Sequence, residues 1–149
     1  MIFTILDHYK SFVENNFIKN DKNQISVLKK IYNIWESNRR KKIFFKQRKI
    51  HGVYLYGNVG TGKTFILNLF YQNTKVGKKI HFNHLMNEVH SIINSNKDRN
   101  KKLENYVKEL SLKYKLIFID ELHIFNIVDA LIVDNLFSLF KKYNIFILI

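Results

Sequence analysis

Eight consecutive residues carry the clearest chemical signal in the chain. Positions 57–64 match the pattern GxxxxGK[ST] without a mismatch. This is the pattern of a P-loop, in which backbone N–H groups and the start of the next helix surround phosphate oxygens. Glycines permit this close approach because they have no Cβ atom. We therefore predict that a nucleotide phosphate is bound by Gly57, Asn58, Val59, Gly60, Thr61, Gly62, Lys63 and Thr64.

Two side chains of the motif have specific predicted roles. The Lys63 ammonium would lie between the β- and γ-phosphates of ATP, and the Thr64 hydroxyl would bind Mg²⁺. A glycine-rich turn with a surface lysine is the alternative interpretation. However, the motif also has an apolar strand-like segment before it and a helical pattern after it, as a P-loop requires.

A P-loop also calls for an acidic residue at the end of a buried neighbouring strand. Residues 116–119 are all apolar, and Asp120 and Glu121 follow directly. Asp120 would hold Mg²⁺ through water, and Glu121 would orient and deprotonate the water that attacks the γ-phosphate. The alternative is that the Asp-Glu pair caps the next helix.

The elements around these motifs alternate between strands and helices. We predict strands at residues 53–56, 79–82, 116–119 and 145–149, and helices at 61–72, 85–94, 100–114 and 127–142. This order is typical of βαβ units and predicts an α/β fold with a parallel sheet and flanking helices. Two further helices are expected before it, at 4–16 and 21–37. The second has a predicted apolar face of Ile25, Leu28, Tyr32 and Trp35, with Asp21 as the N-cap.

We expect two parts, an N-terminal helical segment with a basic linker at 1–50 and a partial P-loop ATPase core at 51–149. The chain of 149 residues has 25 Lys and Arg against 12 Asp and Glu, a net charge of +13. A basic run between residues 39 and 49 leaves nucleic-acid binding open, but we expect no specific site, because lysines are spread along the whole chain.

Other classes of site are not favoured. The absence of cysteine excludes disulfides and thiolate metal sites. His81, His84 and His90 lie close together but lack the usual zinc-site spacing, so structural or partner-facing roles are expected. No apolar run is long enough to span a membrane and no targeting segment is evident, so we expect a cytoplasmic protein.

From about Asp21 onward the sequence resembles the AFG-one-like family of AAA-type ATPases, the family of cell division protein ZapE. Residues 52–57 and 67–71 are similar to the family's strand and helix around the P-loop. Residues 81–90 read HFNHLMNEVH, similar to HFHxFMxxVH, with Asn83 and Leu85 as departures. The pattern DExxxxDIxDA is matched from Asp120 to Ala130, except that Asn126 replaces an Asp, and Leu122 replaces the usual Phe. Asp21 and Gln24 match a D-x-x-Q pattern.

The resemblance implies an ATP-binding, Mg²⁺-dependent ATPase linked to cell division at the FtsZ ring or to quality control of membrane-associated proteins. It also implies a sheet order of 5-1-4-3-2 and a possible homo-oligomer. In such enzymes a sensor residue, arginine fingers, a fifth strand and a lid follow the fourth strand. We therefore expect a core truncated in the fourth strand, with weak ATP binding and little hydrolysis. A DNA-associated ATPase of the helicase-loader kind and a nucleotide-binding remnant without turnover are the alternatives.

Overall fold

The computed structural model describes residues 2–39, 49–94 and 98–149. The chain divides into two compact units, residues 1–75 and 76–149, here called the N-terminal and C-terminal units. The predicted division into a helical segment and a P-loop core after residue 50 stays a prediction. In the described ranges no helix combines the length and the apolar character that crossing a membrane requires.

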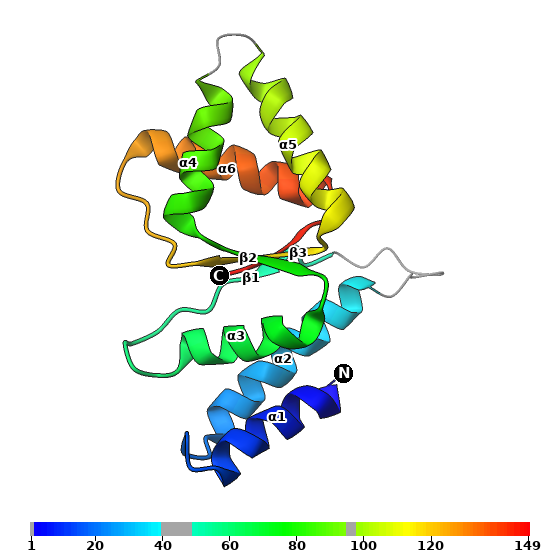
Figure 1. The fold of residues 1–149 in the computed structure, drawn as a ribbon, viewed down its shortest axis with the longest axis vertical. Coiled ribbons are helices and arrows are strands. Elements are labelled where there is room, and N and C mark those ends of the chain that lie inside the picture. Colours follow the sequence, from blue (N-terminus) through cyan, green and yellow to red (C-terminus); the bar gives the residue numbers. More distant parts are fainter. Residues whose placement is uncertain (1, 40–48, 95–97) are drawn as a thin grey trace. The chain divides into compact units, whose positions relative to one another are not determined.

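The N-terminal unit is a set of helices around the predicted P-loop. It contains α1 (Ile2–Glu14), α2 (Lys22–Arg39), the short strand β1 (Gly52–Val53) and α3 (Lys63–Thr74). Aromatic side chains join the helices: the Phe12 and Phe65 rings meet edge to face with centroids 5.2 Å apart, and those of Trp35 and Phe70 are 6.4 Å apart. α1 and α2 therefore pack against the helix that follows the loop (Figure 1).

The start of α2 has the predicted cap. Asp21 Oδ1 accepts hydrogen bonds from the backbone N–H groups of Asn23 at 2.7 Å and Gln24 at 3.4 Å. These are two of the N–H groups that a helix leaves without partners, so the carboxylate stabilises the helix start. The buried face of α2 contains Leu28 and Trp35 as predicted.

Two N-terminal predictions need correction. The third fully buried residue of α2 is Ile31, while Tyr32 and Ile25 are only partly buried. The strand predicted over residues 53–56 is also shorter, because β1 ends at Val53. Tyr54 and Tyr56 are exposed and their rings stack with centroids 6.0 Å apart. The phenolic hydroxyl gives each of these rings a polar end that can stay hydrated, so this run does not need the burial that an apolar strand would require.

The C-terminal unit contains a parallel sheet with strands in the order β4-β3-β2. The strands are β2 (Gly77–His81), β3 (Leu116–Asp120) and β4 (Phe146–Leu148), and the helices are α4 (Phe82–Ile93), α5 (Arg99–Lys113) and α6 (Ile127–Lys142). All three helices cover the same face of this sheet (Figure 1). The parallel α/β class and the 4-3-2 part of the strand order are confirmed.

Burial in this unit follows the sequence pattern closely. The four apolar residues of β3 are at most 1 % exposed, as expected for a strand segment without polar residues. The helix α6 has the predicted bounds. The largest boundary difference is at the start of α4, predicted at residue 85. Phe82, predicted as the end of a strand, begins this helix, because the extended backbone of His81 ends β2 and lets the Phe82 ring enter the core.

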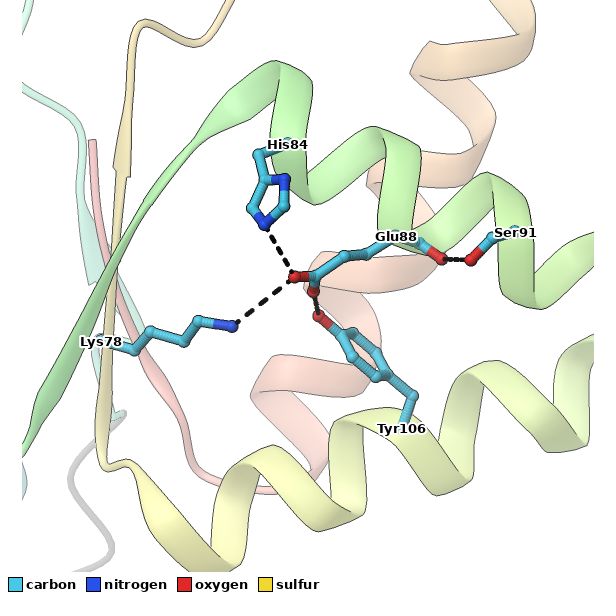
Figure 2. Close-up of polar contacts among 5 residues, drawn as sticks. All are labelled: Lys78, His84, Glu88, Ser91 and Tyr106. Carbon is cyan, nitrogen blue, oxygen red and sulfur yellow. Dashed lines mark hydrogen bonds and ion pairs between the residues drawn. The ribbon is translucent and has the colours of Figure 1, made fainter.

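A single carboxylate connects three elements of the C-terminal unit. Glu88 on α4 accepts a hydrogen bond from the Tyr106 hydroxyl on α5, and its other oxygen lies 3.1 Å from His84 Nε2 and 3.9 Å from Lys78 Nζ of β2 (Figure 2). Burial, reinforced by the bond to Glu88, raises the pKa of Tyr106 above its usual range. The neutral hydroxyl therefore remains a donor at ordinary pH.

We expect Tyr106→Phe to lower the free energy of unfolding by about 1–2 kcal/mol at pH 7, because Glu88 loses a partly buried donor. A group whose pKa is raised in the folded state stabilises the protein at pH values below its unfolded-state pKa. This stabilisation is lost as the pH rises past the unfolded-state pKa toward the folded-state pKa. The wild type should therefore lose more stability than Tyr106→Phe above about pH 10. Urea unfolding at pH 7 and above about pH 10 measures the free energy of unfolding of both proteins. The exposed Tyr54→Phe is the control, and equal pH dependence of Tyr106→Phe and wild type would contradict the prediction.

Candidate functional site

The loop at residues 57–64 has the backbone conformation that its glycines allow. Gly60 and Gly62 have φ angles of 82° and 81°, in the left-handed region. A Cβ atom at Gly60 would meet no heavy atom within 4 Å, so its backbone conformation, rather than lack of space, requires glycine there. The turn ends where α3 begins, at Lys63.

The Lys63 ammonium lies across the loop. Its Nζ donates to the backbone oxygens of Gly57 at 2.9 Å and Asn58 at 2.7 Å, and Thr61 Oγ1 donates to the same Asn58 oxygen at 3.0 Å. These bonds place a positive charge beside the turn. The loop thus brings its one cation to the start of a helix.

The start of α3 has the chemistry of an anion site. Gly62 has no side chain with which to cap the helix, so the N–H groups of the first turn are left for other partners. The positive end of the helix dipole is located there as well. Thr64, the second residue of α3, is exposed, so its hydroxyl is accessible to a metal ion.

Asp120 and Glu121 lie at the carboxyl end of β3 in the C-terminal unit. Asp120 Oδ2 is 2.8 Å from Lys79 Nζ, and β2 and β3 pair His81 with Asp120. The oxygen that could bind a metal is therefore held by an ammonium from the neighbouring strand. The P-loop belongs to the N-terminal unit, so a shared role for the two sets of residues stays a prediction.

Glu121 is held by a histidine. Its backbone is in the left-handed region with φ 56°, and its carboxylate lies 3.0 Å from His81 Nε2. His81, the last residue of β2, was predicted to be structural or partner-facing, and its pairing with Glu121 was missed. Only the strand register brings the two together, and no local spacing reports this.

Two later residues of the segment that starts at Asp120, Asn126 and Asp129, form the start of α6. Asn126 Oδ1 accepts from the Asp129 N–H and Asn126 Nδ2 donates to Asp129 Oδ2, both at 2.7 Å. His90 of α4 lies 2.9 Å from the other Asp129 oxygen. Asn126 is thus the N-cap of α6, and the alternative in which Asp120 and Glu121 cap that helix is wrong.

The histidines of residues 81–90 are each paired with a carboxylate: His81 with Glu121, His84 with Glu88 and His90 with Asp129. Among the described residues no three His, Asp or Glu side chains lie close enough to hold a metal ion together. Most of the basic run, residues 40–48, lies outside the described residues. Predictions about nucleic-acid binding by that run are therefore not tested.

The fold and the loop define a P-loop NTPase-like protein. A family model described as AFG1-like ATPase matches residues 6–147, and the chain belongs to that family. The match begins earlier than the predicted resemblance from Asp21, so α1 is part of the family region.

Three relatives illustrate the match. An uncharacterized protein of Schizosaccharomyces pombe is 32% identical over 106 residues, covering 66% of this chain and 23% of that protein. Lactation elevated protein 1 homolog B of Danio rerio is 38% identical over 104 residues, covering 60% and 21%. Cell division protein ZapE of Escherichia coli K12 is 29% identical over 93 residues, covering 61% and 25%. The chain thus spans about a quarter of these relatives' lengths. No solved structure matches it.

We expect Asn126→Ala to lower the free energy of unfolding by about 0.5–2 kcal/mol, because α6 loses its cap and Asp129 loses a donor. The exposed Asn135→Ala on the same helix is the matched control. Urea denaturation followed by circular dichroism measures the difference. Equal stability of the two variants would show that the reciprocal bonds of Asn126 and Asp129 do not stabilise the helix start.

Proposed function

We propose that the chain binds ATP at residues 57–64 and that it forms part of a Mg²⁺-dependent ATPase. The observation that carries the proposal is the loop itself, with left-handed glycines, an ammonium held beside the turn and a helix start without a side-chain cap. Membership of the AFG1-like ATPase family supports it independently. The γ- and β-phosphates would accept hydrogen bonds from the backbone N–H groups and from Lys63.

Oxygen atoms suited to Mg²⁺ are available in both units. Thr64 would contribute its hydroxyl, and Asp120 its carboxylate through water, after releasing Lys79. The bound ion neutralises charge on the phosphate oxygens. Glu121 would orient the attacking water and accept its proton. Before that step, His81 would hold the Glu121 carboxylate in place.

The first test removes the cation of the loop. We expect Lys63→Ala to weaken ATP binding by about 10- to 100-fold, because a charged hydrogen-bond donor contributes about 1.5–3 kcal/mol. Titration with a fluorescent ATP analogue measures this. Lys29→Ala on the exposed side of α2 removes the same charge in the same unit and is the control.

Unchanged affinity of Lys63→Ala would overturn the assignment of the loop. Comparable losses in Lys63→Ala and Lys29→Ala would indicate that net charge alone attracts the nucleotide. Binding of ATP by the wild type without phosphate release would support the binding module rather than the enzyme.

The second test addresses the metal. We expect Asp120→Asn to bind ATP without Mg²⁺ about as tightly as the wild type, and to gain about three- to tenfold less affinity when Mg²⁺ is added. The neutral amide is a poorer ligand for a hard cation than a carboxylate. Asp134→Asn, on the exposed face of α6, is the control. An undiminished Mg²⁺ effect in Asp120→Asn would remove this residue from the metal site.

A protein client is proposed on the family membership and on the name of the Escherichia coli relative, a cell division protein. FtsZ polymer is the specific candidate. We expect the chain to sediment with FtsZ filaments in the presence of ATP, and the Lys63→Ala variant to do so less. Failure of the wild type to sediment with the filaments would contradict this link and leave nucleotide binding unaffected.

A further inference from the structure

We infer that Gln24 is a positioning residue for the phosphate-binding loop, holding the peptide group between Thr61 and Gly62. This inference rests on the proposed function of residues 57–64. Gln24 lies on α2, 37 positions before Thr61, and its Nε2 donates to the Thr61 backbone oxygen at 3.2 Å. The side chain therefore connects a helix outside the motif to the turn that would contact phosphate.

The Gln24 amide has a defined orientation. The Asp21 N–H donates to the Tyr9 hydroxyl oxygen at 3.0 Å. The hydroxyl in turn donates to Gln24 Oε1 at 3.0 Å, a shorter distance than the 3.4 Å to its other acceptor, the Asp21 backbone oxygen. Tyr9 is only 1 % exposed, so water has little access to compete for this bond. The reversed amide would place Oε1 against the Thr61 oxygen, where neither atom can donate. Tyr9 therefore directs Nε2 toward the loop.

Holding the Thr61 oxygen also orients the next N–H. A trans peptide group is planar, and its C=O and N–H point in opposite directions. Because the Thr61 oxygen points toward Gln24, the Gly62 N–H must point away from α2. Gly62 is the N-cap of α3 and directly precedes Lys63, so this N–H lies at the helix start that would contact phosphate.

The space around Gly62 shows how closely the Gln24 amide approaches the loop. A Cβ atom there would lie 2.6 Å from Gln24 Nε2. Gly62 thus meets two requirements, a left-handed backbone and room for the Gln24 amide. In the D-x-x-Q pattern Asp21 caps α2, while Gln24 one turn later reaches the loop.

The test compares binding of ATP and of inorganic triphosphate by isothermal titration calorimetry. We expect Gln24→Met, which retains length and loses both hydrogen bonds, to weaken binding of both ligands by about three- to tenfold. The loss should be similar for the two, because the loop contacts phosphate and not the base. Gln72→Met, at an exposed position of α3, is the matched control and should bind as the wild type does.

Tyr9→Phe is the second variant, because it retains the ring and removes the hydroxyl, which donates to the Gln24 amide and accepts from the Asp21 N–H. We expect a smaller loss in the same direction, and no further loss when it is added to Gln24→Met. Thermal unfolding of each ligand-free variant separates a loss of loop positioning from general destabilisation. A positioning role predicts that the variants bind more weakly while they are fully folded.

Wild-type affinity in folded Gln24→Met, alongside loss in Lys63→Ala, would overturn the role of Gln24 and leave the proposed function standing. Loss for ATP but not for triphosphate would also overturn it. Failure of the wild type to bind either ligand would overturn the inference together with the function on which it rests.

Discussion

The P-loop surrounds phosphate with backbone N–H groups by turning the chain through left-handed conformations directly before a helix. Residues 57–64 meet this constraint, since Gly60 and Gly62 adopt those conformations and α3 begins at Lys63. The rest of the N-terminal unit supports this turn. α1 and α2 pack their aromatic side chains on α3, and Gln24 reaches the loop from the capped first turn of α2.

The C-terminal unit places its acidic residues by another rule. Parallel strands bring their carboxyl ends to one edge, so the end of β2 lies beside the end of β3. Lys79 and His81 of β2 consequently contact Asp120 and Glu121. The Lys79 ammonium therefore balances the charge of Asp120, and the His81 ring contacts the Glu121 carboxylate. If Asp120 binds Mg²⁺ as proposed, the ion would compete with the Lys79 ammonium for this carboxylate.

Features encoded by neighbouring residues could be predicted from the sequence. The buried strand β3 and the bounds of α6 depend on local spacing, which is why they were predicted accurately. Contacts between distant residues could not be predicted in the same way. The pairing of His81 with Glu121 depends on strand register, and the bond from Gln24 to Thr61 depends on helix packing. The D-x-x-Q pattern was visible, but its geometry was not.

The most direct measurement of the central claim is ¹H–¹⁵N NMR of the backbone amides during titration with ATP. The account predicts that the largest shifts occur at Gly60, Gly62, Lys63 and Thr64, whose N–H groups would surround the phosphates, and that inorganic triphosphate reproduces them. Amide shifts that are small in the loop and concentrated elsewhere, with ATP bound, would show that this turn is not the phosphate site and would contradict the account.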